Sequence, residues 1–138
     1  MIDRDRLAAM LIALDASPRT LRRPVCRGWV GDWQITGRHG HIIPDGHGFL
    51  IYVATDESPR RWGFVKQRLA FCRVTQDGDD EGCLRLDRLP TQTEADAIRE
   101  AIGVKRRRHL SAEALVALER ARGAVGRHHQ PQGLAEAA

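Results

Sequence analysis

The chain has 138 residues, of which 42% are hydrophobic, 29% charged and 5% aromatic. This length suits one domain that buries about two thirds of its unfolded surface, and the composition excludes a wholly disordered chain. The formal net charge of +4 combines 22 Lys and Arg with 18 Asp and Glu, and all but two of the basic residues are arginines.

The cellular location follows from what the sequence lacks. No apolar run approaches the roughly 20 residues of a membrane span, and the start Met1–Arg6 has no signal-peptide pattern. The three cysteines, Cys26, Cys72 and Cys83, are an odd number without paired spacing, which is typical of a reducing compartment. We therefore expect a cytoplasmic protein with no membrane partner, and the sequence leaves its oligomeric state open.

Residues 1–16 predict an amphipathic N-terminal helix, which Ser17-Pro18 ends. Its apolar side chains recur at helical spacing and are Leu7, Met10, Leu11 and Leu14. Residues 19–27 then predict an irregular basic connector, because four arginines and a proline crowd it.

Residues 29–88 predict a sheet region. Turn-forming glycines separate three β-prone runs, 33–36, 41–43 and 49–54, which predict a three-stranded antiparallel meander. The last run is apolar at both even and odd positions. This pattern predicts a central strand that is covered on both faces.

A helix over residues 59–69 interrupts the sheet. Ser58-Pro59 supplies an N-cap and a proline at the first helical position. Trp62, Val65 and Leu69 form its apolar stripe, and Phe64 falls off this stripe, so we expect Phe64 to be exposed.

The runs 71–75 and 83–88 flank an acidic, glycine-bearing loop over 77–82 and predict a β-hairpin. Side-chain alternation places Cys72 in the core and Cys83 toward the surface. The two thiols then lie on opposite faces, which argues against a disulfide between them.

Residues 90–123 predict a C-terminal helical pair. Thr91 and Glu94 have capping-box spacing, Gly103 ends the first helix, and Ser111 caps the second. Residues 127–138 predict a disordered tail. Residues 1–126 thus predict a single α+β domain, an antiparallel sheet of about five short strands with an inserted helix, an N-terminal helix and the C-terminal pair.

The segment Lys105-Arg106-Arg107-Arg108-His109 is the main functional signal. Four fixed positive charges and a histidine are packed into a connector between two helices. Such a run is costly to bury, so it is either a solvated loop or a contact for the phosphates of a polyanion. A helix-turn-helix is not favoured, because the linker is long and the last helix carries Glu113 and Glu119, which repel DNA.

Two other segments contribute to the predicted phosphate contact. They supply Arg22 and Arg23 in the basic connector, and Arg61 and Arg68 on the inserted helix. Arg61 and Arg68 are seven residues apart and so share a helix face.

Aromatic side chains have two interpretations. Trp29, Trp33, Tyr52, Trp62 and Phe64 would be stacking platforms for bases if exposed. In a chain so poor in aromatic residues, most of them are expected in the core instead.

Enzymatic signals are weak. His39, His41 and His47, with Cys26 upstream, match no zinc pattern. No motif fixes the geometry of a nuclease centre, for which the candidate carboxylates are Asp32, Asp45, Asp56 and Glu57. We therefore expect no cofactor, no metal and no catalytic residue.

The sequence thus predicts a small non-catalytic nucleic-acid-binding protein, an accessory or regulatory factor for which DNA is favoured over RNA as the partner. A protein-interaction module or inhibitor is the alternative, and a metal-dependent hydrolase is the third possibility. A clustered positive surface would favour the first, and an apolar patch around Phe64, Trp29 or Trp33 the second.

Overall fold

The computed structural model describes residues 3–129, in two compact units that divide between Arg107 and Arg108. The predicted helical pair of residues 90–123 is therefore shared between the units. Residues 127–129, predicted as part of a disordered tail, belong to the last helix. The rest of the predicted tail lies outside the described residues.

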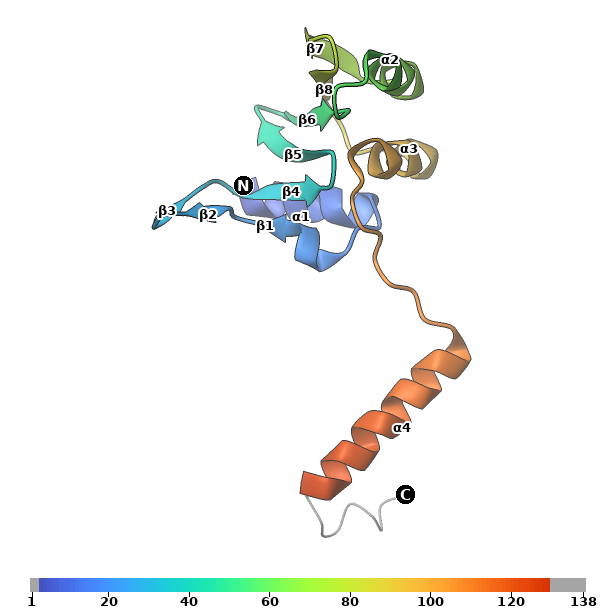
Figure 1. Cartoon of the computed structure of the whole chain (residues 1–138). Helices are drawn as coiled ribbons and strands as arrows, with labels where there is room; N and C mark the ends of the chain where they lie inside the picture. The colour runs from blue at the N-terminus through green and yellow to red at the C-terminus, as the bar shows by residue number, and fades with distance from the viewer. Residues whose placement is uncertain (1–2, 130–138) are drawn as a thin grey trace. The chain divides into compact units, whose positions relative to one another are not determined.

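The first unit is an α+β fold (Figure 1). Its helices are α1 (Asp3–Ala13), α2 (Pro59–Arg68) and α3 (Gln92–Ile102), with a 3-10 turn, η1 (Pro18–Thr20). Its strands are β1 (Leu21–Arg22), β2 (Val25–Cys26), β3 (Trp29–Val30), β4 (Gln34–Gly37), β5 (Gly40–Asp45), β6 (Gly48–Ala54), β7 (Arg73–Asp77) and β8 (Glu81–Leu86). The second unit contains α4 (Ala112–His129). No described helix is long and apolar enough to cross a membrane.

Six strands form one antiparallel sheet in the order β1-β4-β5-β6-β8-β7, while β2 and β3 form a separate hairpin. The predicted meander is confirmed as β4, β5 and β6, and the predicted second hairpin as β7 and β8. Cross-strand pairing aligns one buried row over four strands, made of Ile35, Ile42, Ile51 and Leu84.

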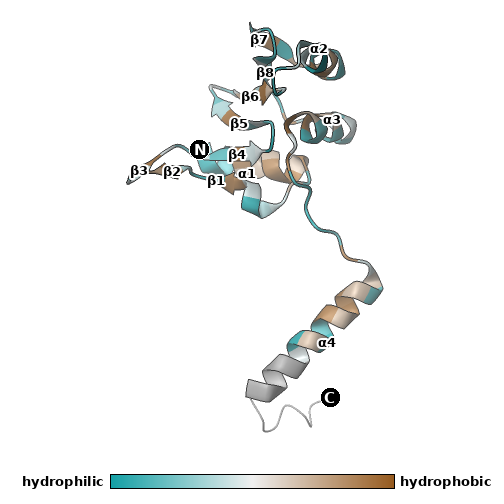
Figure 2. Cartoon of the chain, viewed as in Figure 1, coloured by the Kyte–Doolittle hydropathy of each residue, from teal (hydrophilic) through white to brown (hydrophobic). Residues whose placement is uncertain are grey.

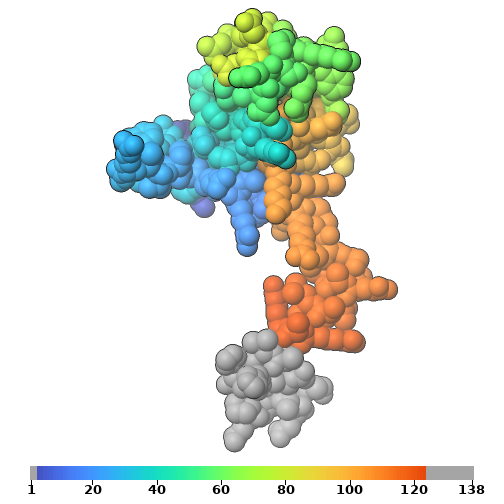
Figure 3. Space-filling view, in the orientation of Figure 1, coloured from blue at the N-terminus to red at the C-terminus, as the bar shows by residue number. Residues whose placement is uncertain are grey.

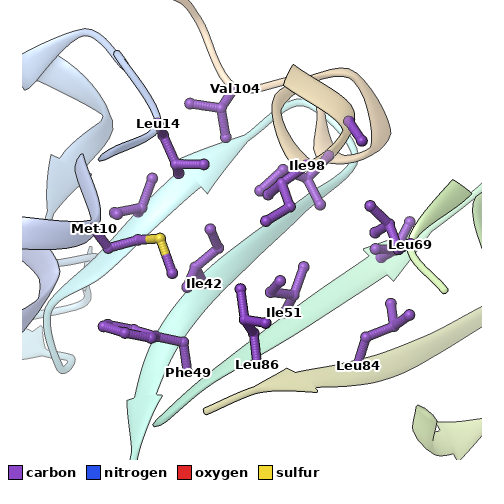
Figure 4. Packing of buried hydrophobic residues seen from close by; sticks show 14 of the residues in the cluster. Met10, Leu14, Ile42, Phe49, Ile51, Leu69, Leu84, Leu86, Ile98 and Val104 are labelled. Carbon is purple, nitrogen blue, oxygen red and sulfur yellow. The ribbon is translucent and has the colours of Figure 1, made fainter. Parts of the chain in front are cut away.

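The core lies between this row and the three helices of the first unit. Figure 4 shows Met10 of α1, Leu14 just after that helix, and Ile98 of α3 gathered over Ile42 and Ile51. Each large side chain buried in this way stabilises the fold by about 1.5–3 kcal/mol relative to exposure.

Capping residues set the ends of α2 and α3 as predicted. The Thr91 hydroxyl accepts the Glu94 N–H, and the Glu94 carboxylate accepts the Thr91 N–H at 2.9 Å. Gly103 ends α3 in the left-handed region, with φ of 66°. In α2, the Ser58 hydroxyl accepts the Arg61 N–H at 3.2 Å.

The prediction of an irregular connector over residues 19–27 is wrong. This stretch holds η1, β1 and β2, and Leu21 and Arg22 of β1 pair with Ile35 and Gln34 of β4. The short β1 joins the sheet through contacts that are distant in sequence, which local composition does not reveal.

The prediction that β6 is a central strand is correct, but the prediction that both of its faces are covered is wrong. β6 is an interior strand, but Leu50 and Tyr52 remain half-exposed. The reason is that α1, α2 and α3 all pack on the opposite side of the sheet, where Ile51 and Val53 belong to the core.

The predicted exposure of Cys83 is wrong, whereas Cys72 packs against the core as predicted. Cys83 is 8% exposed, whereas Cys72 is only half-buried. Cys83 does lie away from the core, but it pairs with Tyr52 on one side and Gln76 on the other, and these larger neighbours cover its small side chain. A bulge between Val74 and Gln76 also breaks the regular alternation on which the prediction depended. All three cysteines are free.

In the second unit, the Ser111 hydroxyl accepts the Ala114 N–H at 3.1 Å, as its predicted capping role requires. Leu115, Val116 and Leu118 of α4 are 47%, 46% and 39% exposed.

Candidate nucleic-acid interface

The predicted contact residues fall into three groups. Arg22 and Arg23 lie in the first unit with Lys105, Arg106 and Arg107, as described below. Arg61 and Arg68 lie on α2. Arg108 and His109 are exposed residues at the start of the second unit.

The first half of the basic run is fixed to the loop after α1. The Ser17 N–H donates to the Lys105 carbonyl at 2.8 Å, and the Arg107 N–H donates to the Asp15 carbonyl at 2.7 Å. Ala16 and Arg106 form an antiparallel bridge between these bonds. Residues 105–107 are therefore held in place, rather than being a free solvated loop.

Further arginines come to the same edge of the sheet. Arg19 is in η1, which begins just after Ser17, and Arg22 is in the edge strand β1. The Arg38 N–H donates to the Gly103 carbonyl at 3.1 Å, next to the basic run. We call this surface the basic edge. Its members are all exposed and are Arg19, Arg22, Arg38, Lys105, Arg106 and Arg107.

One carboxylate, that of Asp15, forms an ion pair with an arginine of the basic edge. Asp15 accepts from the Arg106 Nε at 3.0 Å. This pairing offsets one of six positive charges, so the edge keeps a positive field that attracts phosphate.

An open sheet face adjoins the basic edge. We use this name for the outward side of the main sheet, whose residues include Thr36, His41, Ile43, Leu50, Tyr52, Cys83 and Arg85. The Arg22 Nε donates to the Thr36 hydroxyl at 2.9 Å. Thr36 pairs with His41, and His41 with Tyr52, so a continuous cross-strand row connects the edge to two aromatic rings.

His41 and Tyr52 form the aromatic part of the open sheet face. Their ring centroids are 5.1 Å apart at an interplanar angle of 31°. Burial lowers the pKa of His41, and the hydrogen bond to Glu81 raises the pKa of Tyr52. Both rings are therefore neutral at pH 7, as flat stacking surfaces should be.

The far side of the open sheet face is not basic. The Tyr52 hydroxyl donates to Glu81 at 2.6 Å. Arg85 is held between Asp45 and Asp87, with a distance of 2.6 Å to each carboxylate. Its charge is thus offset within the protein, so this side of the open sheet face adds no unpaired arginine to the basic edge.

Arg23 has a structural role that the sequence did not indicate. Its Nε donates to the Gly31 carbonyl at 2.9 Å, which fastens the base of the β2–β3 hairpin. Its guanidinium also lies 5.9 Å from the Trp33 ring, while Arg4 lies 5.1 Å from it. Trp33 is thereby removed from the candidate stacking platforms.

Exposure separates the other aromatic candidates. Trp62 is 1% exposed and belongs to the core, whereas Trp29 is 67% and Phe64 60% exposed. The expected exposure of Phe64 is confirmed. Trp29 lies in the β2–β3 hairpin, and Phe64 borders a cavity beside α2, together with Arg61 and Arg68.

The histidines and acidic candidates do not form a metal site. Within residues 3–129, no group of three or more His, Cys, Asp or Glu side chains could hold a metal ion. His39 Nδ1 lies 3.5 Å from Asp56, and His41 stacks on Tyr52.

Arg38 and His41 are the residues of the candidate interface that sequence reasoning missed. Arg38 sits in a two-residue turn whose contact with Gly103 is distant in sequence, so no local pattern marks it. The sequence did contain a signal for His41. It lies two residues before Ile43 in a β-prone run, so the two side chains are on the same face of the strand.

Comparison of the chain with protein-family models, curated proteins and solved structures finds no match.

Proposed function

We propose that the chain is a small non-catalytic nucleic-acid-binding protein whose basic edge contacts phosphates. The observation that carries this proposal is the convergence of three basic segments, around Arg19 and Arg22, Arg38, and Lys105–Arg107, through backbone hydrogen bonds. A field from several fixed arginines attracts a polyanion without reading its sequence.

The open sheet face favours a single strand over a duplex. A single strand can lay its phosphates along the basic edge and its bases on the neutral rings of His41 and Tyr52. Each stacked base contributes about 1–3 kcal/mol. Glu81 at the far end of the row repels phosphate and so gives the strand a preferred side. Single-stranded DNA is the form of DNA that this geometry suits.

The first experiment measures binding to single-stranded DNA, duplex DNA and RNA between about 50 and 200 mM salt. The test variant replaces Arg19, Lys105 and Arg107 with Ala. Each lost contact should reduce the salt slope of log K by about 0.7 for a single strand, so we expect weaker binding and a slope shallower by about two units.

A matched variant distinguishes an effect of the basic edge from an effect of the protein's net charge. Replacing Arg60, Arg61 and Arg73 with Ala removes the same charge from exposed positions outside the basic edge and should leave most of the affinity. Tyr52→Leu should weaken single-strand binding selectively, whereas Tyr52→Phe keeps the ring and should not. Equal affinities and salt slopes for the two triple variants would reject the basic edge as the phosphate contact.

A second candidate is docking on a partner protein through the β2–β3 hairpin. Val25, Trp29 and Val30 are 68%, 67% and 45% exposed there. The hairpin stands out from the first unit and carries apolar residues (Figures 2 and 3), and exposed apolar clusters of this kind mark interaction sites.

This second candidate is tested with a photo-crosslinker placed at residue 29 in cells. A discrete crosslinked partner that disappears in a Val25→Ser, Val30→Ser variant would support it. If that variant instead loses nucleic-acid binding, the hairpin belongs to the nucleic-acid interface.

A further inference from the structure

A cavity of about 300 Å³ lies between α2 and α3, at the end of β6. This volume is at the lower end of the range for small-molecule sites. Its apolar lining comes from three elements and includes Ala54, Phe64, Val65, Ala97 and Ala101, while His39 and Thr55 line it from the adjoining loops.

Small side chains create the space. α3 presents Ala97 and Ala101 toward α2, and β6 ends in Ala54. Larger residues at these positions would fill the gap between the helices. The floor is therefore apolar and concave, and Phe64, which is 60% exposed, forms an apolar wall.

Arginines form the rim. Arg60, Arg61 and Arg68 of α2 line the cavity opposite a single carboxylate, Glu100. Arg68 pairs with Glu100 at 2.8 Å. In the part of the chain that the structure describes, neither Arg60 nor Arg61 pairs with a carboxylate, so two positive charges at the rim are not offset by an ion pair.

Nearby acidic residues do not change this balance. Asp56 and Glu57 precede α2, but neither lines the cavity. Asp56 lies 3.5 Å from His39 Nδ1. Arg60 and Arg61 are both exposed. Their side chains can therefore reach an anion over the cavity.

We propose that this cavity binds a small organic carboxylate with an apolar body. The apolar floor and Phe64 would take the body, because they exclude a strongly hydrated ion and gain from being covered. The guanidinium groups of Arg60 and Arg61 would take the carboxylate, for which their planar donors are suited. This site is separate from the basic edge, because none of the residues that line the cavity belongs to that edge.

Octanoate is the first probe, and octanol and acetate are its matched controls. Backbone amide shifts of the labelled full chain are followed during titration. Octanoate should shift amides of α2 and α3 in a saturable manner. Octanol lacks the charge and acetate lacks the apolar body, so both should bind at least about tenfold more weakly, as expected for the loss of a charge-assisted hydrogen bond or of apolar burial.

Three variants locate the site. Arg60→Ala with Arg61→Ala should weaken octanoate binding at least about tenfold and leave octanol unchanged. Ala101→Leu should block both ligands by filling the cavity. Phe64→Ala changes an exposed side chain, so it tests the apolar wall without threatening the fold, and it should weaken both.

The proposal fails if octanoate shifts no α2 or α3 amide at millimolar concentration. It also fails if octanoate binds the Arg60→Ala, Arg61→Ala and Phe64→Ala variants as tightly as the parent chain. Loss of octanoate binding in the triple variant of the basic edge, with the α2 variants unaffected, would assign the anion to the nucleic-acid interface instead.

Discussion

Replacing Gly37 with Ala should destabilise the first unit strongly. A Cβ at this position would lie 2.9 Å from the Ile102 carbonyl carbon, closer still to its oxygen, and 3.1 Å from a Val104 methyl. The same Ile102 oxygen accepts the His39 N–H at 2.9 Å. The added methyl therefore competes with a backbone hydrogen bond at the point where the β4–β5 turn meets the end of α3.

The magnitude combines two effects. Overpacking of a tight site costs about 1–3 kcal/mol, and each of the two backbone bonds from Arg38 and His39 to the end of α3 is worth about 1 kcal/mol. A loss of about 3 kcal/mol is expected, which corresponds to a fall of about 12–24 °C in Tm for a unit of this size.

The assay is thermal and urea denaturation followed by circular dichroism, with Gly63→Ala as the control. A Cβ on Gly63, within α2, meets nothing within 4 Å, so the same change should stabilise the helix by about 0.5–1 kcal/mol. If Gly37→Ala changes the free energy of unfolding by less than about 0.5 kcal/mol, the close packing of the turn on α3 is not what holds this corner together. A Gly37→Ala chain that still folds should also bind nucleic acid more weakly, because Arg38 loses its anchor.

Two further predictions follow from shifted pKa values. The hydrogen bond from Arg88 lowers the pKa of Glu94 from 4.5 to about 2, so this carboxylate stabilises the fold above about pH 4.5 and the contribution disappears as the pH falls toward 2. Urea midpoints at about pH 5 and pH 3 should differ less in Glu94→Gln than in the parent chain; an unchanged difference would contradict this. Burial raises the pKa of Cys72 to about 12 and also raises that of Cys83, whereas Cys26 is exposed. Mass spectrometry after brief alkylation at about pH 8 should therefore find Cys26 modified first, and equal labelling of all three would overturn the assigned burial.

The helices were predictable because their signals are local. The capping box of Thr91 and Glu94, the glycine at 103 and the proline at 59 act within one or two turns, and the apolar stripes follow a fixed period. Hairpins joined by short turns were predictable for the same reason.

Contacts between distant segments were not predictable. The sequence identified the run at 105–109 as basic, but it gave no sign that Lys105 would be fixed to Ser17 or that Arg38 would join it. The cavity is a further case, because alanines such as Ala97 and Ala101 fit a helix stripe equally well whether or not a neighbour fills the space beside them.

The bulge in β7 and the shortness of β1 have a consequence for crowded conditions. Both strands form the outer edges of the main sheet, where unpaired backbone groups invite strand addition from another molecule. β1 offers only Leu21 and Arg22, and the ladder of β7 is broken between Val74 and Gln76, so neither edge is a flat template. Many copies at high concentration should therefore not fuse into an aggregate through their sheet edges.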